Sequence, residues 1–366
     1  MKPPSERDGA IDALRGMVMV LMVIDHTRDF FQPDGASPEN PLSSTPLFFL
    51  MRWVTHTCAP VFIFLAGAST ALAARKRSPA QLQVLLLTRG VWLMFLEVTW
   101  VSFSWFFDFD RTQLGILWGI GGAMVLMSCL IRANQTILGA VGALTLIITS
   151  LVVIPSDMPF LGPLFVPQGF SLGDHSIYSV YVIGTWFSVM TIGYASSNWL
   201  MNSSRRHQAT IGAAMVVAFL ILRALNAPGE PTPWELQDGP LWRTAIDFFN
   251  PSKYPPSIHY LLMTLGASLM AMPLLAKDHA KVNKILHVFG RVPLFFYLMH
   301  LPMAHAMGTV FSSIQFETTS PPADSELSLI RIVIAWLVLL GMLYPMCVAW
   351  GKLKQTHKQR WWTSYV

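Results

Sequence analysis

Arg15 and His26 stand inside the first strongly apolar segment of the chain, residues 11–31, with ten residues between them. An eleven-position step closes about three helical turns, so a helix would place both side chains on nearly one face, on the order of 16 Å apart along the axis. Asp12 and Asp29 fall near the same stripe. Ionisable groups at membrane depth are costly and usually face a bundle interior or an aqueous cavity. The segment is therefore predicted to line a reaction site.

His26 is the candidate general base of this segment. It follows Asp25 directly, and a carboxylate beside an imidazole can orient the ring and stabilise its protonated form. We therefore expect His26 to accept a proton from a substrate, with Asp25 orienting it. The alternative is that His26 makes an ordinary polar contact, while Asp25 joins Arg28 and Asp29 in charge pairs at the helix end.

The second apolar segment adds Arg52 and His56, four residues apart and therefore on one helical face. Pro60, just beyond them, can leave a backbone carbonyl without its helical partner. A role in binding the substrate or the acyl group is one interpretation of Arg52 and His56, and hydrogen bonding inside the bundle is the other.

A third group of polar residues lies near the C-terminus, in a segment bracketed by Pro293 and Pro302. Two prolines favour a kinked helix that lines a cavity. Arg291 is expected near the cytoplasmic end, where it can contact phosphates. His300 is expected about midway and to be functional, while His305 fits packing equally well.

The composition is that of a multi-span membrane protein: 366 residues, 53% hydrophobic and 12% charged. The predicted fold is an all-α bundle of about ten transmembrane helices in a single domain, residues 1–366, with short cytoplasmic tails at 1–9 and 352–366. Apolar runs of roughly spanning length cover residues 11–31, 46–74, 84–106, 114–131, 136–154, 178–200, 209–225, 258–275, 288–311 and 329–350.

Positive charge in the short connections predicts the orientation, because Lys and Arg mark the cytoplasmic side. With the N-terminus inside, every even-numbered connection is basic, so both termini are expected in the cytoplasm. The net charge of +5 is explained in this way, and no nucleic-acid partner is indicated. The basic connections carry Arg75, Lys76, Arg77, Arg132, Arg205, Arg206, Lys277, Lys281, Lys284, Lys352, Lys354, Lys358 and Arg360.

The remaining signals are weaker. Cys58, Cys129 and Cys347 all fall in expected helices without metal-ligand spacing, so buried thiols and no metal site are predicted. The outer connections are rich in Pro, Gly and aromatic residues and are expected to form short interfacial helices and turns. The first apolar run lacks a cleavage site and is expected to remain as the first helix.

Four blocks of sequence resemble the heparan-alpha-glucosaminide N-acetyltransferase catalytic-domain family, and together they extend over nearly the whole chain. The first block, with its Arg and His ten residues apart, is also similar to the first-helix motif of the wider transmembrane acyltransferases that modify bacterial surface glycans. The blocks are residues 11–26 (IDALRGMVMVLMVIDH), 57–67 (TCAPVFIFLAG), 253–257 (KYPPS, with Leu265-Gly266 after it) and 289–297 (FGRVPLFFY, with His300 after it).

The resemblance implies transfer of an acetyl or other short acyl group from cytoplasmic acyl-CoA to a sugar hydroxyl or amine at the opposite face of a bacterial inner membrane. His26, oriented by Asp25, would supply the base, and Arg52 or His300 would stabilise the thioester oxyanion. Arg15 and Arg291 would meet the coenzyme phosphates, with Lys284 at the rim.

One departure from the family concerns the base. The lysosomal enzyme of the family has Asn where this chain has His26, and its catalytic histidine lies in the following loop. Residues 32–46 of this chain contain no histidine. Support for His26 therefore comes from the similarity to the wider acyltransferases.

Two other classes of protein fit parts of the pattern. Paired histidines in the spans are what a b-type haem requires, and the candidates are His26, His56, His300 and His305. Buried charges in spans interrupted by Pro and Gly suit a transporter or lipid flippase, although no repeat relates the two halves of the chain.

Overall fold

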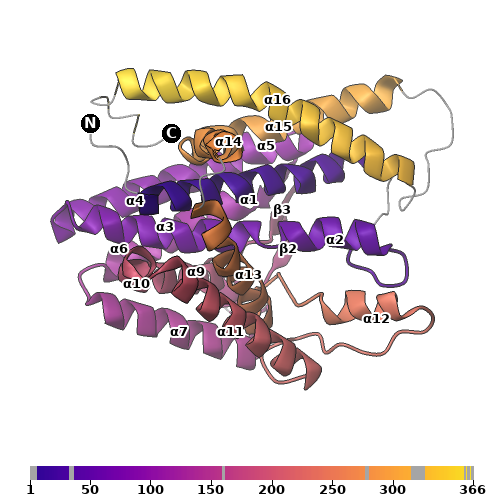
Figure 1. The fold of residues 1–366 in the computed structure, drawn as a ribbon, viewed down its shortest axis with the longest axis horizontal. Coiled ribbons are helices and arrows are strands. Elements are labelled where there is room, and N and C mark those ends of the chain that lie inside the picture. Colours follow the sequence, from indigo (N-terminus) through magenta and orange to yellow (C-terminus); the bar gives the residue numbers. More distant parts are fainter. Residues whose placement is uncertain are drawn as a thin grey trace. The chain divides into compact units, whose positions relative to one another are not determined.

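The computed structural model describes residues 6–32, 37–158, 161–276, 280–314, 326–357, 360 and 363. Figure 1 shows its helices and strands, coloured along the sequence. The chain divides into two compact units, which are described separately. Unit 1 comprises Met1–Cys58, Trp234–Asn250 and Leu274–Val366, and unit 2 comprises Ala59–Pro233 and Pro251–Pro273.

Unit 1 is built around α1, the long first helix, which contacts the last three helices of the chain, α14, α15 and α16. A buried apolar cluster of Phe48, Leu329 and Ile332 joins α2 to α16. The helices of unit 1 are α1 (Glu6–Phe31), α2 (Pro46–Thr55), α12 (Leu241–Phe248), α14 (Ala280–Gly290), α15 (Pro293–Ile314) and α16 (Glu326–Thr356).

Two glycines let α1 and α14 approach each other backbone to backbone. A Cβ added at Gly16 would lie 2.0 Å from the carbonyl oxygen of Leu286, and one added at Gly290 would lie 2.0 Å from the carbonyl oxygen of Asp12. Neither contact is sterically possible, so glycine is required at both positions. This packing brings the end of α14, and Arg291 just beyond it, beside the first half of α1.

The turn after α2 positions the second group of polar residues. Thr45 caps the start of α2, where its side chain accepts a hydrogen bond from the backbone of Phe48. The helix ends at Thr55, the chain turns through His56, and the next helix begins at Cys58. The apolar run 46–74 is therefore two helices, and Arg52 and His56 lie at the end of the first.

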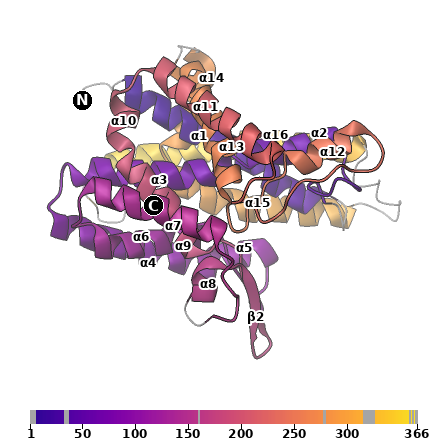
Figure 2. The same cartoon turned by 90° about the horizontal axis from the view of Figure 1, so that it is seen from below.

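Unit 2 contains most of the other helices and a small sheet with strand order β1-β3-β2. Strand β3 runs parallel to β1 and antiparallel to β2, and Figure 2 shows β2 extending away from the helices of this unit. Its elements are α3 (Cys58–Ala74), α4 (Pro79–Leu96), η1 (Glu97–Val101, a π-helix), α5 (Ser102–Phe106), β1 (Arg111–Leu114), α6 (Ile116–Leu130), α7 (Gln135–Leu151), α8 (Leu161–Phe165), β2 (Gln168–Leu172), β3 (His175–Ser179), α9 (Ile183–Ala195), α10 (Ser197–Asn202), α11 (Arg205–Ala224) and α13 (Ile258–Ala276).

The buried carboxyl group of Glu97 holds two elements of unit 2 together. Its carboxylate accepts hydrogen bonds from the backbone N–H groups of Gly115, at 3.2 Å, and Leu117, at 2.8 Å. These groups belong to the start of α6, where unpaired N–H groups favour a negative charge. Glu97 therefore caps α6.

Every apolar run that the sequence indicated contains a helix, and the described chain is mostly helical. Among the described residues, six helical stretches are long and apolar enough to cross a membrane, so ten spans stay a prediction. The expectation for the outer connections was wrong in part: α8 and α12 are short helices as expected, but residues 168–179 form a hairpin, in which successive residues of β2 and β3 pair in antiparallel register. The six stretches are Pro46–Ala74, Pro79–Phe106, Arg205–Ala224, Ile258–Leu275, Pro293–Ser312 and Ser328–Thr356.

Within unit 1, the start of α1 and the end of α16 lie at the same end in both views (Figures 1 and 2). This agrees with termini on one side of the membrane, although the cytoplasmic assignment stays a prediction. Lys277 and Lys358 lie outside the described residues, as does the side chain of Lys281. The single-domain organisation also stays a prediction.

Candidate active site

All of the site residues that the sequence indicated belong to unit 1, although they come from distant parts of the chain. The first helix supplies three of them, and helices α14 and α15 with the turn between them supply three more. They are Arg15, Asp25 and His26 on α1, Arg52 and His56 at the end of α2, and Lys284, Arg291 and His300 near the C-terminus.

The centre of the site is a pair of histidines, here called the dyad, formed by His26 and His300. Nδ1 of His26 lies 2.6 Å from Nε2 of His300. The ring centroids are 4.9 Å apart with 20° between the ring planes. The distance between the centroids is about equal to the distance between the two nitrogens plus the radii of the two rings. The rings therefore meet edge to edge in nearly one plane, as a linear hydrogen bond requires. His300 is fully buried and His26 is half-buried.

The surroundings of His300 decide the protonation pattern of the neutral dyad. Nδ1 of His300 lies 3.2 Å from the carbonyl oxygen of Phe296, which can only accept, so this nitrogen carries the proton. Nε2 of a neutral His300 is then an acceptor, and Nδ1 of His26 must donate to it. The remaining lone pair of His26 therefore lies on Nε2, the nitrogen that points away from His300.

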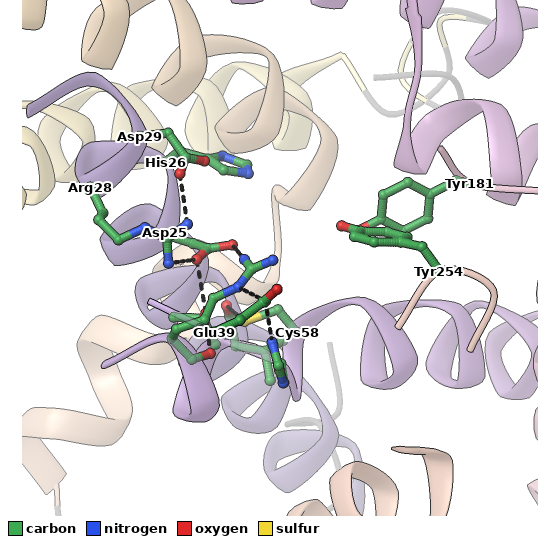
Figure 3. Close-up of polar contacts among 12 residues, drawn as sticks. Asp25, His26, Arg28, Asp29, Glu39, Cys58, Tyr181 and Tyr254 are labelled. Atoms are coloured by element: carbon green, nitrogen blue, oxygen red, sulfur yellow. Dashed lines mark hydrogen bonds and ion pairs between the residues drawn. The ribbon is translucent and has the colours of Figure 1, made fainter. Parts of the chain in front are cut away.

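Asp25 makes a different set of contacts from its neighbour. Its carboxylate pairs with Arg28 at 2.7 Å, accepts a hydrogen bond from Thr55 at 3.0 Å and pairs closely with Arg52 (Figure 3). The position that an orienting carboxylate would occupy, beside Nδ1 of His26, holds His300. The geometry therefore favours His300 as the residue that orients His26, with Asp25 fixing two arginines.

Glu39 is part of the site although the sequence did not indicate it. Its carboxylate accepts hydrogen bonds from Nε of Arg52 at 2.6 Å and from Nε2 of His56 at 3.1 Å, and Asn250 donates to its backbone carbonyl. Partial burial disfavours its charge, but the hydrogen bond from His56 and the positive charge of Arg52 hold the pKa of Glu39 well below its usual range. Nothing in the spacing of the sequence distinguishes this loop carboxylate.

The other end of unit 1 gathers basic residues. Arg15 pairs with Asp12 at 2.9 Å and reaches the carbonyl oxygen of Gly290 at 3.4 Å. The next residue, Arg291, is exposed and lines a cavity of about 410 Å³ together with Lys352 and Lys354. In the sequence, the two lysines served only as a signal of orientation.

Lys284 is also exposed, on α14, and it is not among the residues that line this cavity. The cavity wall is completed by Val288 on α14, Val292 in the turn before α15 and Val348 near the end of α16. The basic cavity is therefore an amphipathic site, lined by both cations and valines.

The arrangement of the metal-ligating residue types bears on metal and haem binding. Among the described residues, no three His, Cys, Asp or Glu side chains are grouped so that they could hold a metal ion. Two bonds of about 2 Å each would separate the nitrogens of two axial histidines by about 4 Å, and the 2.6 Å contact of the dyad leaves no room for an iron between them.

The comparisons with known proteins give the family. The model of the catalytic region of heparan-alpha-glucosaminide N-acetyltransferase matches residues 7–225, more than half of the 366-residue chain. The chain belongs to this family. The comparison with curated proteins found no match.

Membership of the acetyltransferase family, together with six long apolar helices, makes this chain a multi-pass membrane protein with an acyltransferase-type activity. The match includes α1 and α2, and therefore Arg15, His26 and Arg52. It ends before α15, so His300 and Arg291 lie in the part of the chain beyond the matched region.

Proposed function

We propose that this protein transfers an acetyl or other short acyl group from cytoplasmic acyl-CoA to a hydroxyl or amine of a sugar at the opposite face of a bacterial inner membrane. The observation that carries the proposal is the dyad, a buried His300 hydrogen-bonded to the half-buried His26. In a neutral dyad this arrangement puts the basic lone pair on His26, the less buried of the two rings, and acyl transfer to a sugar requires such a base.

The reaction begins when Nε2 of His26 takes a proton from the sugar hydroxyl or amine. The oxygen or nitrogen of the sugar then attacks the thioester carbonyl carbon, and a tetrahedral intermediate with a negatively charged oxygen forms. When this intermediate collapses, the carbon–sulfur bond breaks, and the protonated His26 returns its proton to the leaving thiolate. The products are the acylated sugar and free coenzyme A, and the dyad is again neutral.

Arg52 is proposed to stabilise the negative charge of the intermediate. Its guanidinium is held between the carboxylates of Asp25 and Glu39, so its position is fixed before the reaction starts. A charge placed in advance in a site of low dielectric stabilises a transition state more strongly than a mobile one. His56, on the other side of Glu39, is proposed to keep that carboxylate in place.

The basic cavity is proposed to bind the phosphates of the coenzyme, through Arg291, Lys352 and Lys354. Arg15 and Lys284 are proposed to contribute positive charge nearby. Arg291 and His300 are nine positions apart along one stretch of the chain, or about 13 Å at helical rise. A donor held at the cavity can therefore extend its acyl end towards the dyad.

The test is transfer of labelled acetyl from acetyl-CoA to methyl α-glucosaminide by the purified full chain and by His26→Ala. Loss of a general base lowers the rate about 10²-fold to 10⁴-fold, and the variant is expected to fold normally because His26 is half-buried. The matched control is His305→Phe, which keeps the ring that stacks on Phe30 and is expected to transfer at the wild-type rate. Undiminished transfer by His26→Ala would remove the proposed base.

A further inference from the structure

Unit 1 contains a second cavity, of about 530 Å³, between the outer end of α1, the second half of α15 and the first half of α16. It is called the apolar groove here. Its lining includes Phe31, Met307, Val310, Phe311 and Val338, and among the described residues that line it Arg331 is the charged one. The volume falls within the range of about 300–1,000 Å³ that is usual for ligand pockets.

The apolar groove begins close to the dyad. Phe31 is five residues beyond His26 on α1, and Met307 is seven residues beyond His300 on α15. At 1.5 Å per residue these steps are about 8 Å and 10 Å along the two helices. The groove therefore begins within about two helical turns of the dyad.

The groove and the basic cavity lie at opposite ends of one helix. Arg331 and Lys352 are both on α16, twenty-one residues apart. This is about 31 Å along a helix, close to the thickness of the hydrocarbon core of a bilayer. One cavity therefore lies near each face of the membrane, and the apolar groove lies near the face opposite the proposed donor site.

The chemistry of the groove suits one class of ligand. Its walls offer apolar surface, which stabilises a hydrocarbon chain, and a water-soluble sugar would gain little there. The guanidinium of Arg331 lies 5.4 Å from the centroid of the Phe311 ring, at the lining of the same groove. An arginine at the wall of an apolar groove is suited to a phosphate, which it can bind with two parallel hydrogen bonds.

We propose that the apolar groove holds the hydrocarbon chain of a phosphate-linked lipid, that Arg331 binds its phosphate, and that this lipid carries the acceptor sugar. The proposal rests on the acyltransferase function proposed above and narrows its acceptor to a lipid-linked glycan. Anchoring the chain in the groove keeps the sugar at the face where Nε2 of His26 can reach it.

The experiment compares two acceptors that carry the same sugar, an α-glucosaminyl phosphate of a long-chain polyprenol and methyl α-glucosaminide, each with acetyl-CoA. Val310→Trp fills the groove from a position that is 57% exposed, and Arg331→Gln removes its charge. Ile330→Trp is the matched control, because Ile330 is 53% exposed on the same helix and does not line the groove. Arg331→Lys tests rescue by a retained charge.

Both groove variants are expected to raise KM for the lipid-linked acceptor about tenfold, which corresponds to about 1.4 kcal/mol of binding. Their kcat and their KM for the methyl glycoside are expected to stay at wild-type values, as are all constants of Ile330→Trp. Polyprenyl phosphate is expected to inhibit transfer in the wild type but not in Arg331→Gln.

Equal effects of the groove variants on both acceptors would overturn the inference, as would no effect on either. Inhibition by phosphatidylglycerol as strong as that by polyprenyl phosphate would show an ordinary lipid site and would also overturn it. In each of these outcomes the acyltransferase function stands, because acetyl still reaches a sugar. Absence of transfer from acetyl-CoA to both acceptors by the wild type would instead contradict the proposed function itself.

Discussion

Replacing His300 tests whether the dyad, rather than His26 alone, supplies the base. The residue is fully buried and touches His26 through one nitrogen and the Phe296 carbonyl through the other. His300→Phe keeps the ring volume but removes the acceptor for Nδ1–H of His26. His300→Gln keeps an acceptor, because the amide oxygen can receive the same hydrogen bond.

The size of the effect follows from the hydrogen bond that is lost. A buried donor left without an acceptor costs about 1–3 kcal/mol, and His26 can avoid this cost by moving its proton to Nε2. The moved proton blocks the nitrogen that acts as base, so the penalty appears in kcat. At 1.36 kcal/mol for each factor of ten, His300→Phe is expected to lower kcat about 5-fold to 150-fold. His300→Gln is expected to lose less than about 5-fold.

Two measurements check the reasoning. Steady-state kinetics give kcat and KM for acetyl-CoA, and KM is expected to stay unchanged because His300 does not line the basic cavity. Nitrogen NMR of labelled histidine reports the tautomer of His26, expected as Nδ1–H in the wild type and in His300→Gln, and shifted towards Nε2–H in His300→Phe. A folded His300→Phe protein with wild-type kcat, or with an unchanged tautomer, would refute the dyad.

Three further predictions follow from the charged contacts of unit 1. Asp25→Asn leaves the buried Arg28 and the partly buried Arg52 without their shared carboxylate. It is therefore expected to lower the free energy of unfolding by about 3–5 kcal/mol in a detergent unfolding titration, while the folded fraction keeps the Nδ1–H tautomer of His26. A stable variant that had lost kcat would favour a catalytic Asp25 instead. The double variant Arg291→Gln, Lys352→Gln is expected to raise KM for acetyl-CoA at least about tenfold at unchanged kcat. The control is Lys76→Gln, at an exposed lysine that does not line the cavity. An unchanged KM would place the coenzyme phosphates elsewhere. Folding lowers the pKa of Glu39, so the ionised carboxylate stabilises the protein fully above the ordinary carboxyl pKa of about 4.3, and this stabilisation is lost as the pH falls below it. The difference in thermal stability between the wild type and Glu39→Gln is therefore expected to shrink in acid. A difference that grew in acid would contradict the contacts of Glu39 with Arg52 and His56.

The helices were predictable because their signals are local. Apolar runs of spanning length mark helices wherever they occur, and the step from Arg15 to His26 can be converted into a shared face by arithmetic alone. The same arithmetic could not show the break after Thr55, where the backbone of one apolar run turns between two helices. Nor could it show the hairpin of residues 168–179, whose strands are short and largely exposed.

The contacts of the site were less predictable because they join distant parts of the chain. His26 and His300 were both selected from the sequence, but as a base and as a separate oxyanion donor. Their contact joins residues separated by 274 positions, and no spacing rule specifies such a pair. Adjacency suggested Asp25 as the partner of His26, yet neighbours on a helix point about 100° apart. The nearer residue in sequence was therefore the less suitable partner.

The choice of a second histidine over a carboxylate has a physical reason in this environment. A carboxylate beside His26 would place a permanent charge in the protein interior, whereas a neutral His300 can accept the same hydrogen bond without one. The chain does bury a carboxylate nearby, Asp25, but only between two arginines. Counting Asp25, Asp29 and Glu39 against Arg28 and Arg52 gives a formal charge of −1 for this cluster. A proton on His56, which donates to Glu39, would bring the cluster to neutrality, so the dyad can take up and return its proton beside a balanced set of charges.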